Sequence, residues 1–283
     1  MEASSFPPDA AAAPPPGPLR PADAVAPARI RVPTRGNRRL EALLQAVNED
    51  LQVKAWWHMA QVNANRLGMS DHSWVHVQIV CNIALRLVRL LGRRGVEPAI
   101  VSDHGLSARD AEVVIVAGCL LHDVGMSIHR TDHEAYSLFL AADKLGDLLA
   151  ASYVEPERSV ILAEAMHAII GHRRRGDPFT LEAGIVRVAD ALDLAKGRSR
   201  VPFEAGRMNI HSLSAAAIDD VRIEMGEERA VRIEIAMNNS SGIFQVDELL
   251  ATKLRGSGLE QHVEVIARID AEHEKRLVPV FRI

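Results

Sequence analysis

Apolar residues recur at intervals of three and four between about residues 37 and 194, which is the pattern of amphipathic helices. The clearest stripe combines His76 with Val80, Ile83 and Leu87, and it predicts a long helix that ends near Leu91. Further helices are predicted at about 37–47, 55–67, 107–125, from 133 onward, at 157–170 and at 178–194. The pattern therefore predicts a mainly α protein whose core is a helical bundle.

The pattern changes after about Ser199. Residues 221–225 and 231–235 alternate between apolar and polar side chains on either side of a turn that contains Gly226, as expected for a β-hairpin. A helix is predicted at 246–254 and a third strand at 262–266. We therefore expect the bundle to span residues 37–205 and a small α+β module to span residues 206–283.

Residues 1–36 differ from the rest of the chain in composition. They contain an alanine tract and many prolines, among them the run 14–16. Such a segment cannot bury enough apolar surface to fold alone. We expect a disordered tail over residues 1–36.

The overall composition narrows the class of protein and of ligand. A chain of 283 residues with 48% hydrophobic content can bury a sizeable core, and its net charge of -4 favours small ligands over nucleic acid or anionic membranes. Cys81 and Cys119 lie in apolar helical stretches, where reduced thiols are expected. No apolar stretch approaches the roughly 20 residues that a membrane span needs. We therefore expect a cytoplasmic protein that does not enter a membrane.

Imidazole and carboxylate side chains fall on several of the predicted helices. His122 and Asp123 stand together in the last turn of the helix that stops at Gly125, His76 lies on a core-facing stripe, and Asp190 lies on the last helix. Three further candidates lie between the central pair and Asp190, namely His133, His167 and His172. Such side chains, converging from separate helices, are what a buried site for divalent metals requires. The sequence therefore predicts a metal-dependent hydrolase.

The order of these residues resembles the HD superfamily of metal-dependent phosphohydrolases. The segment CLLHDVG at 119–125 is similar to the family's central motif, and VADA at 188–191 is similar to its last motif. The resemblance covers roughly residues 68–200, and beyond it the chain is similar to prokaryotic HD proteins with a C-terminal α+β module. It implies a bundle of five or more helices in which one metal ion is bound by His76, His122, Asp123 and Asp190.

The resemblance also implies a second metal ion, which Asp123 would share with the first and which His133 and His172 would bind. His167 is the alternative to His172, because positions five residues apart on a helix differ by about 140° and cannot both face one ion unless the helix ends between them. Mixed imidazole and carboxylate ligands suit Mn, Fe, Zn, Ni or Co better than Mg or Ca, and we expect Mn first. Two ions about 3.5–4 Å apart could activate a shared hydroxide for in-line attack on phosphorus, so Asp123 would be structural and catalytic at once.

The transition state of phosphoryl transfer needs further positive charge. The candidates directly follow His172 and Asp190, and they are Arg173, Arg174, Arg175, Lys196 and Arg198. The family's central motif commonly continues with a lysine after the glycine, whereas this chain has Met126 there, so Lys196 or an arginine is expected to take that role. His129 is a candidate general acid for the leaving oxygen, because its pKa lies near neutral pH.

Two neighbours of the predicted ligands are assigned no direct role. His72 shares a helical face with His76, but it is expected near the cap, solvated or beyond the ligands. Asp193 falls off the helical face of Asp190 and is expected at the surface or in a salt bridge.

Two functions remain open. The first is an enzyme that hydrolyses phosphate esters, expected to be a phosphodiesterase for nucleotides or cyclic mononucleotides, with phosphomonoesters as competing substrates. The second is a regulatory or binding protein that keeps the metal for structure and recognises a partner through the C-terminal module. The alternating strands after residue 220 could pair across a two-fold axis, so a homodimer is expected.

Overall fold

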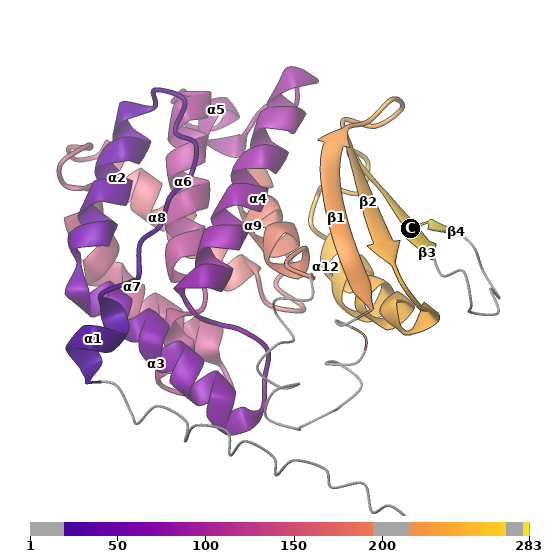
Figure 1. The fold of residues 1–283 in the computed structure, drawn as a ribbon. Coiled ribbons are helices and arrows are strands. Elements are labelled where there is room, and N and C mark those ends of the chain that lie inside the picture. Colours follow the sequence, from indigo (N-terminus) through magenta and orange to yellow (C-terminus); the bar gives the residue numbers. More distant parts are fainter. Residues whose placement is uncertain (1–19, 195–213, 215–216, 270–279, 283) are drawn as a thin grey trace, which may run out of the picture.

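The computed structural model describes residues 20–194, 214, 217–269 and 280–282, and it places them in a helical bundle and a sheet module (Figure 1). The bundle contains α1 (Pro21–Val25), α2 (Arg38–Glu49), α3 (Leu51–Leu67), α4 (Trp74–Arg93), α5 (Ala99–Ser102), α6 (Ala108–Leu121), the 3-10 turn η1 (Val124–Ser127), α7 (His133–Leu149), α8 (Glu157–Gly171) and α9 (Leu181–Ala191). This confirms the mainly α fold that the spacing of apolar residues predicts.

The centre of the bundle is α6. Every residue from Val113 to Leu121 is buried, and α6 contacts α2, α4, α8 and α9. A Cβ at Gly118 would lie 3.0 Å from the Cβ of Ala168 on α8, so the small residue lets these two helices approach closely. The end of α6 therefore lies deep among its neighbours.

The beginning of α6 is fixed by a buried carboxylate. Ser107 and Asp110 form the predicted capping box, and Asp110 also accepts hydrogen bonds from the Tyr153 hydroxyl at 2.7 Å and from the Arg39 guanidinium at 2.6 Å. Burial alone would raise the pKa of Asp110, but the hydrogen bonds from Tyr153, Ser107 and Arg39 outweigh it and lower this pKa below its ordinary value. These bonds fix α6 against α2 and the loop after α7.

The long helix α4 departs from one expectation. By length and composition it could cross a membrane, although no stretch of the sequence was expected to qualify. In the bundle, α4 packs on α6 and α9, and its residues Val80 and Leu87 are fully buried. Its apolar character is thus explained by its place in the core, where its first turn carries His76.

The sheet module follows the bundle. Its strands are β1 (Ile218–Met225), β2 (Val231–Met237), β3 (Val263–Ile269) and β4 (Val280–Arg282), in the order β1-β2-β3-β4. The strands β1 and β2 form the predicted antiparallel hairpin, and β3 is the predicted third strand. Between β2 and β3 lie η3 (Ser240–Gly242), the π-helical η4 (Gln245–Ala251) and α12 (Thr252–Leu254). This helical connection returns the chain to the same end of the sheet, so β2 and β3 are parallel.

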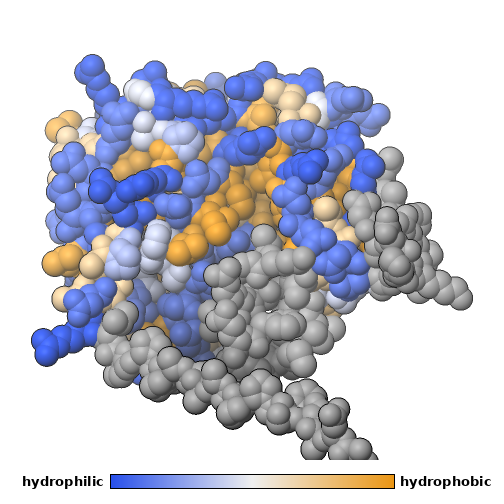
Figure 2. All heavy atoms as spheres, viewed as in Figure 1, coloured by the Kyte–Doolittle hydropathy of each residue, from blue (hydrophilic) through white to orange (hydrophobic). Residues whose placement is uncertain are grey.

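The module packs directly on the bundle. The strands β1 and β2 contact α4, while η4 and α12 contact α9 (Figure 1). Figure 2 shows apolar side chains gathered in a band across the middle of this face, where α4 runs in Figure 1. Val75 and Ile79 of α4 are among the exposed large apolar residues. The two parts of the chain therefore share a surface formed by α4 and α9.

Residues 20–36 correct the expected extent of the tail. They include α1, and Val25, Ala28 and Ile30 are buried. The backbone of Ile30 pairs with the side chain of Asn48 on α2, at 2.7 Å and 2.9 Å. An extended segment that gains its contacts from the bundle has no periodicity of its own, so the proline-rich composition did not reveal it. The domain boundary expected at residue 205 lies outside the described residues.

Several helix boundaries also differ from expectation. The helix α6 ends at Leu121, whereas it was expected to continue to Gly125 with His122 and Asp123 in its last turn. The helix α3 begins at Leu51, earlier than the expected residue 55, and α9 begins at Leu181, later than the expected residue 178. The last helix of the bundle ends at Ala191 and not near Leu194. The two helix ends bear on the candidate site, because they leave Asp123 and Asp193 outside regular helix.

Candidate metal centre

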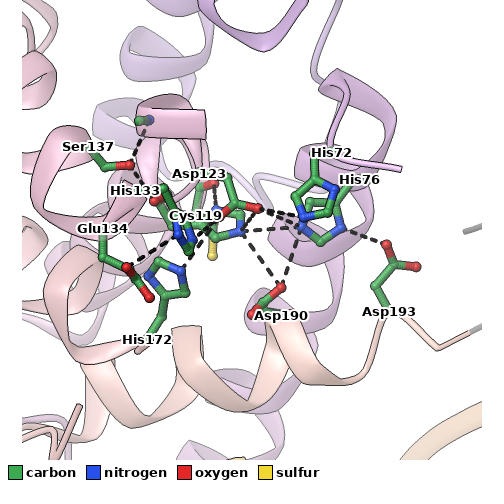
Figure 3. A network of polar contacts seen from close by, with 12 residues as sticks. His72, His76, Cys119, Asp123, His133, Glu134, Ser137, His172, Asp190 and Asp193 are labelled. Atoms are coloured by element: carbon green, nitrogen blue, oxygen red, sulfur yellow. Dashed lines mark hydrogen bonds and ion pairs between the residues drawn. The ribbon is translucent and has the colours of Figure 1, made fainter. Parts of the chain in front are cut away.

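Six side chains from distant parts of the sequence come together where α4, α6, α7, α8 and α9 meet (Figure 3). They form two groups, His76–His122–Asp123–Asp190 and Asp123–His133–His172, which share Asp123. Within each group the candidate ligand atoms all lie within 4.8 Å of one another. These are the two groups that the family resemblance implies, where His167 was left open as the alternative to His172.

The end of α6 determines where His122 and Asp123 point. The helix ends at Leu121, His122 is its C-cap, and Asp123 has left the helical conformation with φ -107° and ψ 5°. The chain then turns through η1. Consecutive residues can therefore face the same centre, which a continuing helix would not allow.

Gly125 allows this turn to pack against the beginning of α7. A Cβ at Gly125 would lie 1.9 Å from the carbonyl oxygen of His133 and 2.5 Å from the backbone nitrogen of Ser137. The Gly125 N–H donates to the Ser137 hydroxyl at 2.8 Å, and that hydroxyl donates to the His122 carbonyl at 2.6 Å. The glycine of the central motif thus holds His133 beside Asp123.

The first group surrounds one point. His76 Nε2 lies 3.3 Å from His122 Nε2, 3.6 Å from Asp123 Oδ2 and 3.5 Å from Asp190 Oδ1. His122 Nε2 lies 3.4 Å from Asp123 Oδ2. Donor atoms about 2.0–2.2 Å from a shared cation lie roughly 3–3.6 Å from one another, which is close to these separations.

The second group lies on the other side of Asp123. Its Oδ1 lies 3.1 Å from His133 Nε2 and 3.6 Å from His172 Nε2, whereas its Oδ2 faces His76 and His122. A single carboxylate therefore points one oxygen into each group (Figure 3).

The outer nitrogens of the imidazole rings contact protein acceptors. His122 Nδ1 donates to the Cys119 carbonyl at 2.8 Å, His172 Nδ1 donates to the Ile169 carbonyl at 2.5 Å, and His76 Nδ1 lies 2.7 Å from Asp193 Oδ2. A proton on Nδ1 leaves the Nε2 lone pair directed into the site. Lone pairs of neutral imidazoles that face carboxylate oxygens at these distances are the donor set of a divalent cation.

The charge states of Asp123 and His172 agree with this donor set. Burial alone would raise the pKa of Asp123, but the attraction of His122 and hydrogen bonds from His122, His133 and His172 hold this pKa well below its ordinary value. Burial lowers the pKa of His172 to about 4, helped by the nearby Lys253 ammonium and His122. An ionised carboxylate and a neutral imidazole are the protonation states in which these groups bind metals.

Of the two alternatives for the second group, the structure brings His172 to the site and not His167. The helix α8 ends at Gly171, so His172 is its C-cap and turns inward. His167 is still within the helix, where its ring stacks on Phe179 with centroids 4.7 Å apart and its Nε2 accepts a hydrogen bond from the Phe179 N–H at 2.9 Å. His167 therefore contacts the loop before α9.

The other predicted site residues lie farther out. His129 is exposed, its Nδ1 accepts from the Thr131 N–H at 3.0 Å, and among the described residues no hydrogen bond or ion pair joins it to the two groups. Arg174 is exposed and pairs with Glu248 of the module at 3.0 Å. Arg173 lies closer, with its Nε 3.9 Å from the Glu134 carboxylate, which in turn lies 3.3 Å from His133 Nδ1. Lys196 and Arg198 lie outside the described residues.

Met126 occupies an apolar slot. It is fully buried and packs with Ala60 and Ala64 of α3, while its carbonyl accepts from the Asn63 side chain at 2.8 Å. Its side chain therefore packs in the interior against α3 and provides no charge to the site.

Three further residues lie near the site, and sequence reasoning anticipated two of them only in part and the third not at all. Asp193 is buried and not at the surface, and its carboxylate pairs with His76, in keeping with the other expectation of a salt bridge. His72 is buried and not solvated, and with its Nε2 4.0 Å from Asp123 Oδ2 it lies just beyond the ligands, which was the other expectation for it. Lys253, from the sheet module, donates to Asp190 Oδ2 at 2.7 Å. No local sequence pattern indicates this last contact.

Asp193 is expected to orient His76. Replacing it with alanine removes the acceptor of the His76 ring, and removal of such an outer partner typically lowers metal affinity about 10–100-fold. We expect Asp193→Ala to weaken Mn²⁺ binding by that factor in a calorimetric titration, and Asp193→Asn, which keeps an acceptor oxygen, to weaken it less. Equal affinity for wild type and Asp193→Ala would show that His76 is oriented without this contact.

Comparisons with known proteins agree with the site. A family model described as HD domain matches residues 72–195, which include all six candidate ligands. The chain is 38% identical over 222 residues to the uncharacterized protein MJ1020 of Methanocaldococcus jannaschii, an alignment that covers 78% of this chain and 86% of that protein. No solved structure matches the chain. The matching family model and the buried His and Asp cluster establish that the chain belongs to the HD superfamily of metal-dependent phosphohydrolases.

Proposed function

We propose that the protein is a metal-dependent phosphodiesterase that hydrolyses phosphate esters of nucleotides or cyclic mononucleotides, with two divalent ions, expected to be Mn²⁺. The observation that carries the proposal is the position of Asp123, whose two oxygens face two separate sets of imidazoles. A purely structural ion needs a single closed set of ligands. A shared carboxylate between two sets is suited to a pair of ions.

The chain's own residues would divide the work as follows. When bound, two divalent ions make water nucleophilic near neutral pH and neutralise phosphoryl oxygens. Asp123 stays ionised, because its neighbours hold its pKa well below the ordinary value, and it holds the two halves of the site at a fixed separation. His72 borders Asp123 without belonging to either group, so it supports the carboxylate from outside the ligand set.

Phosphate contact is assigned to Arg173. It directly follows His172, and its guanidinium lies beside Glu134 at the edge of the second group. Arg174 pairs instead with Glu248, and its side chain is 70% exposed. His129 remains a proposed proton donor for the leaving oxygen, and it would need a change in its exposed loop to reach the substrate.

The proposed activity is tested with bis-p-nitrophenyl phosphate and a panel of nucleotide esters. Full-length protein, treated with a chelator and then supplied with Mn²⁺, is expected to release nitrophenolate, and the chelated protein is not. Cyclic mononucleotides are expected to be hydrolysed faster than nucleoside monophosphates. Metal binding without hydrolysis of any ester, with Mn²⁺ or other first-row metals, would favour the alternative of a regulatory or binding protein.

The two arginines provide a matched pair of variants. Arg173→Ala is expected to lower kcat/KM roughly tenfold or more, mainly through KM, because a charged hydrogen bond to phosphate is lost. Arg174→Ala should change kcat/KM much less, since its side chain already pairs with Glu248. Steady-state kinetics with Mn²⁺ at saturation would make this comparison. Equal kinetics for Arg173→Ala and wild type would remove Arg173 from the site.

The oligomeric state of the protein and its place in the cell stay predictions. A homodimer is proposed through the sheet module, where β1 is an edge strand. Light scattering of the purified protein gives the mass that tests it. We also propose that the protein acts in the cytoplasm on small phosphate esters.

A further inference from the structure

We propose that the sheet module is part of the metal centre, because its Lys253 positions Asp190 and the turn that carries His172. This inference rests on the proposed function and adds a positioning residue to the same site. It assigns the module a role in metal binding, in addition to any role in assembly.

The contacts of Lys253 lead to this inference. Its Nζ donates to Asp190 Oδ2 at 2.7 Å and to the His172 carbonyl at 2.6 Å. The other oxygen of Asp190, Oδ1, faces His76 Nε2 at 3.5 Å. One ammonium group therefore links a candidate ligand of the first group to the backbone of a candidate ligand of the second, and fixes the direction of Oδ1.

The backbone of Lys253 is fixed by the buried guanidinium of Arg187. Arg187 lies on α9, one turn before Asp190, and is 2% exposed. Its Nε donates to the Lys253 carbonyl at 2.8 Å and its Nη2 to the Thr252 carbonyl at 3.3 Å. The same side chain donates to the carbonyls of Arg173 and Arg174, just after His172. Arg187 thus joins α12 to the His172 turn through backbone acceptors.

The helix α9 and the module are in such close contact at Gly184 that no side chain fits between them. A Cβ at Gly184 would lie 2.0 Å from the carbonyl oxygen of Ser257, in the loop that follows α12. Only glycine allows the backbone of this loop to reach α9. Gly184 and Arg187 lie on successive turns of the helix that also carries Asp190, so the docking of the module and the position of the ligand are determined by the same helix.

The negative charge of the first group explains why an ammonium group beside it is useful. Asp123 and Asp190 bring two carboxylates to the first group, and Met126 is buried away from it. The Lys253 ammonium lies against Asp190, and the Lys253 side chain is only 17% exposed. It therefore supplies a fixed cation next to the candidate ligands from a segment far away in the sequence.

The first experiment compares two lysines. Lys144 pairs with Asp50 Oδ2 at 2.9 Å and is 15% exposed, so Lys144→Met is a matched control for Lys253→Met. In calorimetric titrations of the metal-free, full-length protein with Mn²⁺, Lys253→Met is expected to bind about 10–100-fold more weakly than wild type. Lys144→Met should bind as wild type does. Unchanged or tighter binding in Lys253→Met would overturn the inference, and tighter binding would mean that the ammonium only repels the ion.

Kinetics separate positioning from contact with substrate. Lys253→Met is expected to lower kcat at saturating Mn²⁺ with little change in KM, and Lys253→Arg, which can keep the ion pair, should recover part of kcat. A change confined to KM would assign Lys253 to the substrate and contradict its role as a positioning residue.

The second experiment moves the module without changing a side chain of the site. Gly184→Ala forces the Ser257 loop away from α9, whereas Gly92→Ala on α4 adds a Cβ where nothing lies within 4 Å. We expect Gly184→Ala to weaken Mn²⁺ binding as Lys253→Met does, and Gly92→Ala to leave it unchanged. In the double variant Gly184→Ala/Lys253→Met, the two losses should not add, because the displaced module no longer presents Lys253. Additive losses would mean that the two residues act independently.

The two proposals can fail separately. If wild type binds Mn²⁺ but hydrolyses no ester, the proposed function fails, while the titrations still test Lys253. If wild type hydrolyses esters and Lys253→Met matches it in affinity and kcat, the inference about the module fails alone. Circular dichroism of each variant shows whether Gly184→Ala keeps its helices, and Lys253→Met provides the test if it does not.

Discussion

Asp123→Asn is expected to abolish hydrolysis and to remove at least one of the two metal ions. Asparagine keeps the size of the side chain but loses the charge, and its single carbonyl oxygen can face only one of the two imidazole groups. Asp123 contacts His76 and His122 through Oδ2, and His133 and His172 through Oδ1. The loss in kcat/KM should exceed the roughly 10–100-fold that removal of an outer partner costs. Metal content by mass spectrometry and kinetics with added Mn²⁺ measure both effects.

A surface carboxylate provides the control for Asp123. Asp147 on α7 is exposed, and Asp147→Asn should retain the metal content and kinetics of the wild type. Both variants are expected to keep their helical circular dichroism, because Asp123 lies after the end of α6 and supports no helix by itself. Retention of two ions and of activity by Asp123→Asn would contradict the shared role of this carboxylate.

Gly125→Ala is expected to remove the second metal ion and to destabilise the protein. The new methyl group would meet the His133 carbonyl at 1.9 Å, so the beginning of α7 has to move. His133 Nε2 would then leave its position 3.1 Å from Asp123 Oδ1. Forcing a methyl group into packed interior costs about 1–3 kcal/mol or more in the free energy of unfolding. The number of Mn²⁺ ions bound should fall from about two to about one, as measured by calorimetry.

Gly146 is the matched glycine for this variant. It lies on α7, and a Cβ there would meet only the Leu162 side chain at 3.9 Å, an ordinary contact. Gly146→Ala is therefore expected to bind Mn²⁺ as wild type does and to be at least as stable in urea, since alanine favours helix. If Gly125→Ala and Gly146→Ala bind the same number of ions, the packing of η1 against α7 does not hold His133.

Several candidate ligands could be predicted because they lie on or next to apolar helical patterns. His76 shares the apolar stripe of α4, and His122 and Asp123 follow the long apolar stretch of α6. Their order along the chain then matches a known family. The choice between His167 and His172 depended on where α8 ends, and periodicity does not determine helix ends well. The structure ends that helix at Gly171, which turns His172 inward.

The surface position expected for Asp193 was wrong for a related reason. The spacing of apolar residues predicts a last helix that continues to about Leu194, which would put Asp193 on a different face from Asp190. The helix ends at Ala191, so Asp193 lies in the turn that follows, where angles around a helix no longer apply. Its carboxylate can then reach His76 on α4.

Lys253 could not have been found from local sequence. Its contacts with Asp190 and His172 span 63 and 81 residues and depend on the packing of the module against α9. The hairpin, the third strand and a helical segment between them were predictable from alternation and spacing, but β4 and the side of the bundle on which the module packs were not. That choice depends on shape, and here on the absence of a side chain at Gly184.

The most direct test of the central claim is an anomalous-difference map from crystals of the full-length protein grown with Mn²⁺. Two peaks about 3.5–4 Å apart, one near Asp123 Oδ2 with His76, His122 and Asp190, the other near Asp123 Oδ1 with His133 and His172, are the expected result. A single peak, or none, between these side chains would contradict it.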